Sequence, residues 1–183
     1  MAARTAFLDR DGTINRKARD GGYITSEKDL VLLPRAARAI GRLNEAGIKV
    51  IVVTNQRAVS LGLLERRQLA EIHMALARKL ARQGGHVDRF YCCVHERGSC
   101  TCRKPAPGLL QMAIADDPAI ARAPYVMIGD SLSDIQAGSA AGASTVFLSS
   151  RPVSSPEQRE IGASHVARCL DAAVTWVLQM GAP

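Results

Sequence analysis

Two aspartates stand at the end of the first apolar segment, where their spacing could support chemistry. The segment 5–9 is typical of a buried strand that ends in Asp9, and Asp11 and Gly12 follow it at once. Carboxylates this close need a cation nearby. An ordinary acidic turn is the plain alternative, because Asp and Gly are common turn residues. The chemical hypothesis is that Asp9 is a nucleophile or a metal ligand and that Asp11 is a neighbouring acid/base.

Three later segments add the other groups that phosphoryl transfer needs. Each of them follows or approaches a strand end and carries polar side chains: Thr54, Asn55, Arg103, Lys104, Asp130 and Asp134. Each residue alone has a simpler interpretation: Thr54 could end a strand, Lys104 could be a surface charge, and Asp130 or Asp134 could be an acid in the first turn of a helix. Taken together, they predict Mg²⁺ held by Asp9 and Asp130, with Thr54 and Lys104 holding the phosphoryl oxygens.

The elements that must position these residues alternate between short apolar runs and helical patterns. This alternation is typical of an α/β, doubly wound, Rossmann-like sheet, mostly parallel, with helices on both faces. Ligands of such sheets bind at the carboxyl ends of the strands. The segment 149–156 is rich in Ser and Pro and is predicted to be a loop. The expected strands are 5–9, 48–53, 87–94, 125–128, 144–148 and 165–167, and the expected helices are 34–46, 65–83, 109–115, 132–141 and 170–179.

Composition is that of an ordinary folded protein. The 183 residues are 47% hydrophobic and 22% charged, which suits a single domain over residues 1–183. The net charge of +7 favours an anionic ligand. The sequence contains neither a membrane-spanning apolar run nor a signal-peptide core, so we expect a cytoplasmic protein without a membrane partner. A monomer is favoured.

Four of the five cysteines lie in the segment 92–103, where a metal-binding loop is predicted. Three thiols and one imidazole follow the pattern C-x-H-x4-C-x-C: Cys93, His95, Cys100 and Cys102. Four such ligands match a closed, structural Zn²⁺ site. Buried free cysteines beside an incidental His, or a redox pair, are the alternatives, although C-x-C lacks the usual redox spacing. Zinc would fix the following Arg103 and Lys104. Cys92 is expected to face the other way on its strand, and Cys169 to lie in the core.

The ordered motifs resemble those of a known family. They are FLDRDGTIN at 7–15, VTNQ at 53–56, CRKP at 102–105, and IGD at 128–130 followed by Asp134. In this order they resemble the four motifs of the haloacid dehalogenase (HAD) superfamily of phosphohydrolases. Within it, the chain is most similar to the group of D-glycero-D-manno-heptose 1,7-bisphosphate and histidinol-phosphate phosphatases, some of which carry such a zinc loop. The resemblance spans residues 6–147.

The resemblance implies a covalent mechanism. Asp9 would attack phosphorus and form an aspartyl-phosphate, while Asp11 protonates the leaving alkoxide and then deprotonates the hydrolytic water. Mg²⁺ would be held by the Asp9 carboxylate, the backbone carbonyl of Asp11 and the Asp130 carboxylate.

The same resemblance assigns the remaining motif residues to substrate. Thr54 and Asn55 would grip the phosphoryl group, Lys104 would neutralise that group and the nucleophile, and Arg103 would reach the substrate. Asp134 would be a partner of Lys104 or a helix cap.

The chain departs from the heptose-specific pattern in the loop that borders the substrate. Members usually carry Ser-Gly after Asn-Gln and an Arg shortly beyond; here Arg57 begins the pair and Leu61 stands where the Arg tends to be. Arg57 is a candidate to supply that cation. Ser131 stands where the family often has Lys. Gly22 and Tyr23 match a segment beside the substrate, although by themselves they are a turn and an apolar position.

The functional hypothesis is a Mg²⁺-dependent phosphatase with a minimal cap, because the segment 13–26 is too short for a folded cap. The expected reaction removes the C7 phosphate of the heptose bisphosphate, with histidinol phosphate as the alternative substrate. A nucleic-acid 3′-phosphatase is weakened by the lack of an aromatic cluster. A phosphoreceiver-like module would need an Asp after its third strand, where this chain has Cys and His. A zinc-ribbon module would leave the acids unexplained.

Overall fold

Six parallel strands form one sheet in this computed structural model, which describes residues 4–180. The strand order is β3-β2-β1-β4-β5-β6, and every neighbouring pair is parallel. This confirms the predicted doubly wound α/β sheet. The strands are β1 (Thr5–Leu8), β2 (Lys49–Asn55), β3 (Arg89–Cys93), β4 (Tyr125–Gly129), β5 (Ser144–Leu148) and β6 (His165–Ala167).

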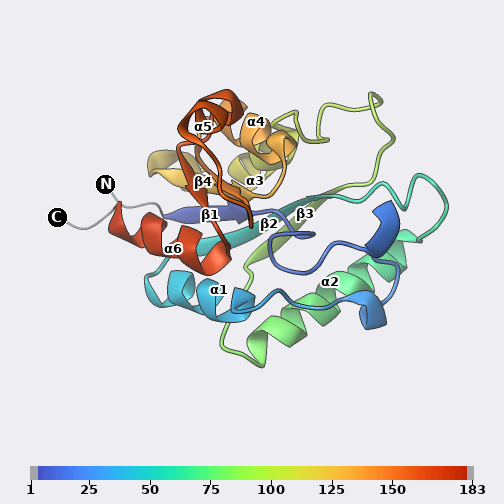
Figure 1. Cartoon of the computed structure of the whole chain (residues 1–183). Helices are drawn as coiled ribbons and strands as arrows, with labels where there is room; N and C mark the ends of the chain where they lie inside the picture. The colour runs from blue at the N-terminus through green and yellow to red at the C-terminus, as the bar shows by residue number, and fades with distance from the viewer. Residues whose placement is uncertain (1–3, 181–183) are drawn as a thin grey trace.

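Helices cover both faces of this sheet (Figure 1). Helices α1, α2 and α6 lie on one face, and α3 and α4 lie on the other. Short 3-10 helices occur at Arg19–Gly21, Glu27–Asp29 and Ile120–Arg122. Within residues 4–180, no helix has both the length and the apolar character needed to cross a membrane. The α-helices are α1 (Ala36–Glu45), α2 (Arg66–Ala81), α3 (Gly108–Asp116), α4 (Leu132–Ala140), α5 (Ser155–Ile161) and α6 (Leu170–Gln179).

The central strands are apolar on both sides because each side packs on a helical layer. In β2, Val50 and Val52 belong to the cluster with α1, α2 and α6, whereas Ile51 and Val53 belong to the cluster with α3. All four are at most 1% exposed. Burial of each such side chain contributes about 1.5–3 kcal/mol, which is why this strand stays fixed in the centre of the sheet.

Two expectations about the chain are wrong. The predicted loop 149–156 overlaps helix α5, which begins at Ser155 and buries no residue. Local capping stabilises it, because Ser154 and Glu157 form a reciprocal capping box and Gly162 ends the helix. Cys169 is exposed at the start of α6 rather than buried in the core.

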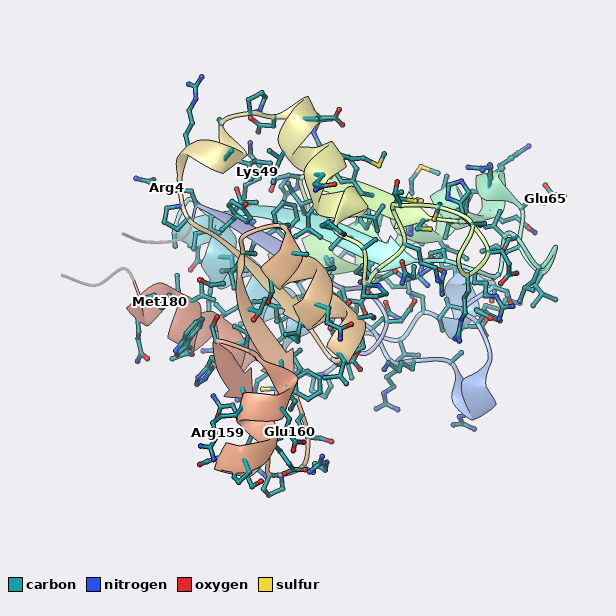
Figure 2. All side chains as sticks on the ribbon, turned by 90° about the horizontal axis from the view of Figure 1, so that it is seen from above. Arg4, Lys49, Glu65, Arg159, Glu160 and Met180 are labelled. Atoms are coloured by element: carbon teal, nitrogen blue, oxygen red, sulfur yellow. The ribbon has the colours of Figure 1, made fainter. Side chains whose placement is uncertain are left out.

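Strand register brings the chemical residues to one edge of the sheet. Leu8 of β1 pairs with Val52 on one side and with Ile128 on the other, so the residues after these positions emerge together. This edge includes the point where the strand order reverses, the usual ligand site of doubly wound folds. Figure 2 shows Glu65 toward this end, with Arg4 and Met180 at the opposite end.

Candidate active site

A buried lysine joins two aspartates at the carboxyl edge of the sheet. The Nζ atom of Lys104 donates to Asp9 Oδ1 and to the carbonyl oxygen of Val53, both at 2.7 Å. It also lies 2.6 Å from Asp134 Oδ1. Lys104 is only 4% exposed, so its charge is held by protein partners rather than by water. The predicted pairing of Lys104 with the nucleophile candidate and with Asp134 is therefore present.

The charge of Asp9 depends on what surrounds it. Burial raises the pKa of Asp9 to about 7, although the ammonium of Lys104 acts to lower it. A carboxylate attacks phosphorus only when it is ionised. A further cation beside Asp9 would favour the ionised form and so prepare the group for attack.

Asp11 is held by a cage of donors that the sequence did not indicate. Arg10 donates to both carboxylate oxygens, from Nε at 3.1 Å and from Nη2 at 2.8 Å. Asn15 Nδ2 and Gln56 Nε2 donate at 2.8 and 2.9 Å. Burial acts to raise the pKa of Asp11, but Arg10 and these bonds lower it below its ordinary value. In this arrangement Asp11 is a carboxylate near neutral pH, the form that accepts a proton from water.

The carboxylates at this edge could hold a divalent cation. Oxygen atoms of Asp9, Asp130 and Asp134 all lie within 4.8 Å of one another. Asp130 Oδ1 is buried and has no hydrogen-bond partner among the described residues, and its Oδ2 lies 2.8 Å from Lys17 Nζ. Burial raises the pKa of Asp130 against the opposing effect of Lys17. A set of desolvated carboxylate oxygens with an unpartnered member fits Mg²⁺.

Asp134 has hydrogen-bond and ion-pair partners on both of its carboxylate oxygens. Asp134 caps α4, because its Oδ2 accepts from the Ser131 N–H at 3.1 Å and from the Ser131 hydroxyl at 2.7 Å. With Lys104 on its other oxygen, Asp134 matches the predicted partner and cap rather than a direct metal ligand.

Gly12 has φ +94°, and a Cβ atom there would lie 2.0 Å from Asp130 Oδ2. Only glycine allows the chain to pass so close to Asp130.

A small cavity of about 180 Å³ collects the predicted catalytic residues. Among the residues that line it are Asp9, Asp11, Thr54, Asn55, Lys104 and Asp130. The volume suits a phosphoryl group, so a larger substrate would extend beyond it. The Thr54 hydroxyl accepts from Gln56 Nε2 at 2.8 Å. The Asn55 side-chain amide donates from Nδ2 to the Lys104 carbonyl oxygen at 3.0 Å and accepts from the Lys104 N–H at 3.1 Å. Asn55 thus holds the Lys104 backbone in place, and its contact with a phosphoryl group stays a prediction.

Four predicted substrate residues lie outside this cavity. The guanidinium of Arg57 forms an ion pair with Glu96 of the cysteine loop, and Tyr23 lies beside it. Gly22 follows the 3-10 helix Arg19–Gly21. Arg103 has one buried guanidinium nitrogen without a partner among the described residues. Neither Gly22, Tyr23, Arg57 nor Arg103 lines the small cavity, so their contact with substrate stays a prediction.

The cysteine loop gathers its four predicted ligands into one cluster. Cys93 Sγ lies 3.6 Å from Cys100 Sγ and 3.7 Å from His95 Nδ1, and Cys102 Sγ lies 3.4 Å from Cys100 Sγ and 3.3 Å from His95 Nδ1. Ligands at about 2.3 Å from a tetrahedral zinc are roughly 3.8 Å apart, so the cluster is compatible with Zn²⁺. Cys92 is exposed and faces away, as expected.

Sequence reasoning missed Arg10, Asn15 and Lys17 as parts of this site. Arg10 stands between the two aspartates of the first motif, yet nothing in its type indicates that it is 0% exposed. Lys17 lies in a charged loop where any lysine would be expected to face solvent. The only available signal was their closeness in sequence to Asp9 and Asp11.

Comparisons with known proteins agree with this geometry. Residues 1–142 match the family model described as hydrolase, haloacid dehalogenase-like hydrolase. The chain is 34% identical over 188 residues to the D-glycero-D-manno-heptose-1,7-bisphosphate 7-phosphatase of Chlorobaculum tepidum, covering 95% of this chain and 94% of the relative. It is 40% identical over 131 residues to the Mycobacterium tuberculosis D-glycero-alpha-D-manno-heptose-1,7-bisphosphate 7-phosphatase, covering 71% and 68%.

A solved phosphatase structure is similar to this fold over nearly the whole chain. The D,D-heptose 1,7-bisphosphate phosphatase of B. bronchiseptica, complexed with magnesium and phosphate, superposes with a TM-score of 0.85 at 30% sequence identity. The match covers 97% of this chain and 99% of that chain. Nearly the whole fold therefore has a counterpart in a phosphatase whose structure holds magnesium and phosphate.

Proposed function

The chain belongs to the haloacid dehalogenase-like hydrolase family and is a phosphoric monoester hydrolase, and we propose that it removes the C7 phosphate of D-glycero-D-manno-heptose 1,7-bisphosphate. The observation that carries the chemistry is the buried contact of Lys104 with Asp9 at 2.7 Å beside the Asp130 carboxylate. The observation that favours this substrate is the full-length similarity to heptose bisphosphate phosphatases.

In the proposed reaction, Asp9 attacks phosphorus and takes the phosphoryl group as an aspartyl-phosphate. Lys104 lies on the Asp9 carboxylate and balances negative charge as it moves onto the phosphoryl oxygens. Asp11 in its protonated form donates a proton to the leaving alkoxide and becomes the carboxylate. It then takes a proton from the water that attacks the aspartyl-phosphate, which releases inorganic phosphate, frees Asp9 and restores the acid form of Asp11 for the next turnover. The contacts with Arg10, Asn15 and Gln56 support the second of these steps directly, because they favour the ionised carboxylate.

Mg²⁺ is the proposed catalytic ion, and the residues that would hold it are Asp9 and Asp130 with the backbone carbonyl of Asp11. When bound, it would neutralise charge on the phosphoryl oxygens and favour the ionised form of the nucleophile. Gly12 supports this assignment, because it leaves the space that the Asp130 carboxylate occupies.

Zn²⁺ is the proposed structural ion of the cysteine loop, and its removal gives a direct prediction. Changing Cys100→Ser together with Cys102→Ser should abolish zinc binding and lower kcat/KM about 100-fold, the usual cost of a small misplacement of catalytic groups. The reason is that Cys102 immediately precedes Arg103 and Lys104. Metal content by mass spectrometry and steady-state kinetics measure the two effects.

Cys92→Ser is the matched control for this experiment, because that thiol is exposed and faces away from the cluster. It should keep wild-type zinc content and kinetics. A double variant with unchanged zinc and unchanged kcat/KM would show that these two thiols neither bind zinc nor position Lys104.

A substrate panel tests the proposed activity itself. Purified protein with Mg²⁺ should release phosphate from a heptose 1,7-bisphosphate with kcat/KM about 100-fold above that for histidinol phosphate, the scale of discrimination that substrate contacts provide. Both anomers belong in the panel, because relatives named for the alpha and the beta form match the chain. A 3′-phosphorylated oligonucleotide is the third substrate class. Preference for histidinol phosphate or for the oligonucleotide would overturn the heptose assignment.

A further inference from the structure

A second cavity lies beside the carboxylate edge, on the side away from Thr54 and Lys104. It has a volume of about 730 Å³ and is lined by segments that follow β5 and β6 and precede α1. Asp130 is the one residue that lines both this cavity and the small acidic one within residues 4–180. None of the other residues with a proposed catalytic role lines the second cavity, so the reaction leaves it unexplained.

The charges that line this cavity are mainly positive. Arg35, Arg151 and Arg168 contribute guanidinium groups, whereas the only acid lining it in the described part of the chain is Asp130, already paired with Lys17. Arg35 has a distant acidic partner, Asp171 at 3.8 Å, and Arg151 pairs with Glu157 at 2.9 Å.

Arg168 differs from these two arginines. Among residues 4–180, no acidic group lies within ion-pair distance of Arg168. Arg168 is therefore the cation most available to an incoming anion.

Backbone groups add to this positive potential. Helices α1 and α6 begin at the cavity, and their N-cap residues, Arg35 and Cys169, give no side-chain cap to the first-turn N–H groups. The positive ends of two helices of ten residues thus face the same space. Thr13, which also lines the cavity, is 0% exposed, and its hydroxyl has no hydrogen-bond partner among the described residues.

Size and lining indicate the kind of ligand. The volume lies within the range of small-molecule sites, roughly 300–1,000 Å³. Phe147, Leu33 and Leu170 supply apolar surface beside the arginines. Arg35 adopts a left-handed conformation, with φ +62°, which residues other than glycine rarely adopt. Such strain is retained where the surroundings hold the residue in place.

We propose that this cavity is a second binding site for the phosphate monoester of a small sugar, with Arg168 as its principal anchor. Guanidinium groups and helix N-termini together match a dianion that accepts several hydrogen bonds. The dianion comes either from a separate sugar phosphate or from the phosphate of the substrate that is not cleaved. The second source rests on the proposed heptose bisphosphatase activity, whereas the first does not.

Calorimetry without turnover tests the first source. Glucose 1-phosphate is titrated into the full-length protein at low salt in buffer free of Mg²⁺ and of chelator, so that no Mg²⁺ can bind phosphate at the catalytic carboxylates and the proposed zinc of the cysteine loop is retained. Wild type should bind one equivalent, and Arg168→Gln should bind at least about tenfold more weakly, the usual effect of losing a charge-assisted hydrogen bond. Arg38→Gln is the matched control, because Arg38 is an exposed residue of α1 that does not line the cavity.

Kinetics with Mg²⁺ tests the second source. Arg168→Gln should raise KM about tenfold for the heptose 1,7-bisphosphate but leave kcat, and KM for the heptose 7-phosphate, unchanged. A binding loss in calorimetry with an unchanged KM for the bisphosphate supports the separate sugar phosphate, whereas a KM increase confined to the bisphosphate supports the substrate's own second phosphate. If Arg168→Gln matches both wild type and Arg38→Gln in both measurements, the second site does not exist. An enzyme inactive on heptose bisphosphates would overturn the proposed function and leave the calorimetric result standing.

Discussion

Asp9→Asn should abolish phosphate release while the protein stays folded. The amide keeps the shape of the carboxyl group but cannot form the aspartyl-phosphate, so we expect turnover to fall roughly 10⁴-fold or more, as when other covalent nucleophiles are removed. Lys104 keeps its contacts with Asp134 and with the Val53 carbonyl. We therefore expect the melting temperature to stay within about 4 °C of wild type, the shift that roughly 1 kcal/mol causes in a chain of this size.

Phosphate release from the heptose bisphosphate and thermal unfolding followed by circular dichroism measure these two effects. Asp117→Asn is the matched control, because that carboxylate pairs with Lys49 and does not line the catalytic cavity. It should retain wild-type turnover. Substantial activity in Asp9→Asn would mean that another group attacks phosphorus, and the covalent mechanism would fall.

The fold was largely predictable because its signals are local. Apolar runs of strand length ended in residues that stop strands, and amphipathic helices ended in glycines such as Gly47 and Gly142, both of which have positive φ. The position of the candidate site was also predictable, because the carboxyl ends of parallel strands lie at the same edge of a sheet. Asp9, Thr54 and Asp130 were placed together on this ground, and they line one cavity.

Helix α5 is an element that the sequence pattern predicted wrongly, as part of a loop. Its capping box at Ser154 and Glu157 and its terminal Gly162 were visible in the sequence, but the Ser and Pro content of the segment favoured a loop. The helix has no buried residue, so the apolar periodicity that identifies other helices was missing. The prediction that Cys169 lies in the core was wrong for a related reason. Free cysteines are usually buried, but the path of the chain places this one at the exposed start of α6.

Side-chain partners within the site depend on contacts between distant segments, which no spacing reveals. The pairing of the Arg57 guanidinium with Glu96, 39 positions along the chain, could not be predicted from the sequence, and the contact of Arg57 with substrate stays a prediction. Asn55 similarly turns its amide onto the Lys104 backbone, 49 positions along the chain. The sequence supplied the types of groups at the edge, and the tertiary structure decided which of them bind each other.

Lys104→Met should destabilise the protein and inactivate it together. The side chain of Lys104 is 2% exposed and lies between Asp9 and Asp134, so its removal leaves buried carboxylates without their cation. Breaking such a buried pair costs about 3–5 kcal/mol. For a chain of this size we expect the melting temperature to fall by roughly 10 °C. Turnover should fall at least about 100-fold, because charge on the phosphoryl oxygens loses its fixed counterion.

The deficit in stability should depend on pH in a defined direction. Burial raises the pKa of Asp9 to about 7 even with Lys104 present, and the loss of Lys104 removes an influence that lowers it. At pH 5 the carboxyl group can keep a proton in the folded state at little cost. At pH 8 the unfolded chain carries this carboxylate ionised in water, so folding must either bind a proton or bury a charge without a partner. Unfolding of the metal-free protein should therefore show a larger difference from wild type at pH 8 than at pH 5.

Lys17→Met separates this effect from a general loss of positive charge near the acids. Lys17 pairs with Asp130 at 2.8 Å, but its side chain is 57% exposed, so its removal should cost no more than about 1 kcal/mol. If the two variants unfold at the same temperature, burial of Lys104 is not what makes its contact with Asp9 strong. If Lys104→Met also turns over substrate at the wild-type rate, the lysine neither balances the phosphoryl charge nor holds the nucleophile in place.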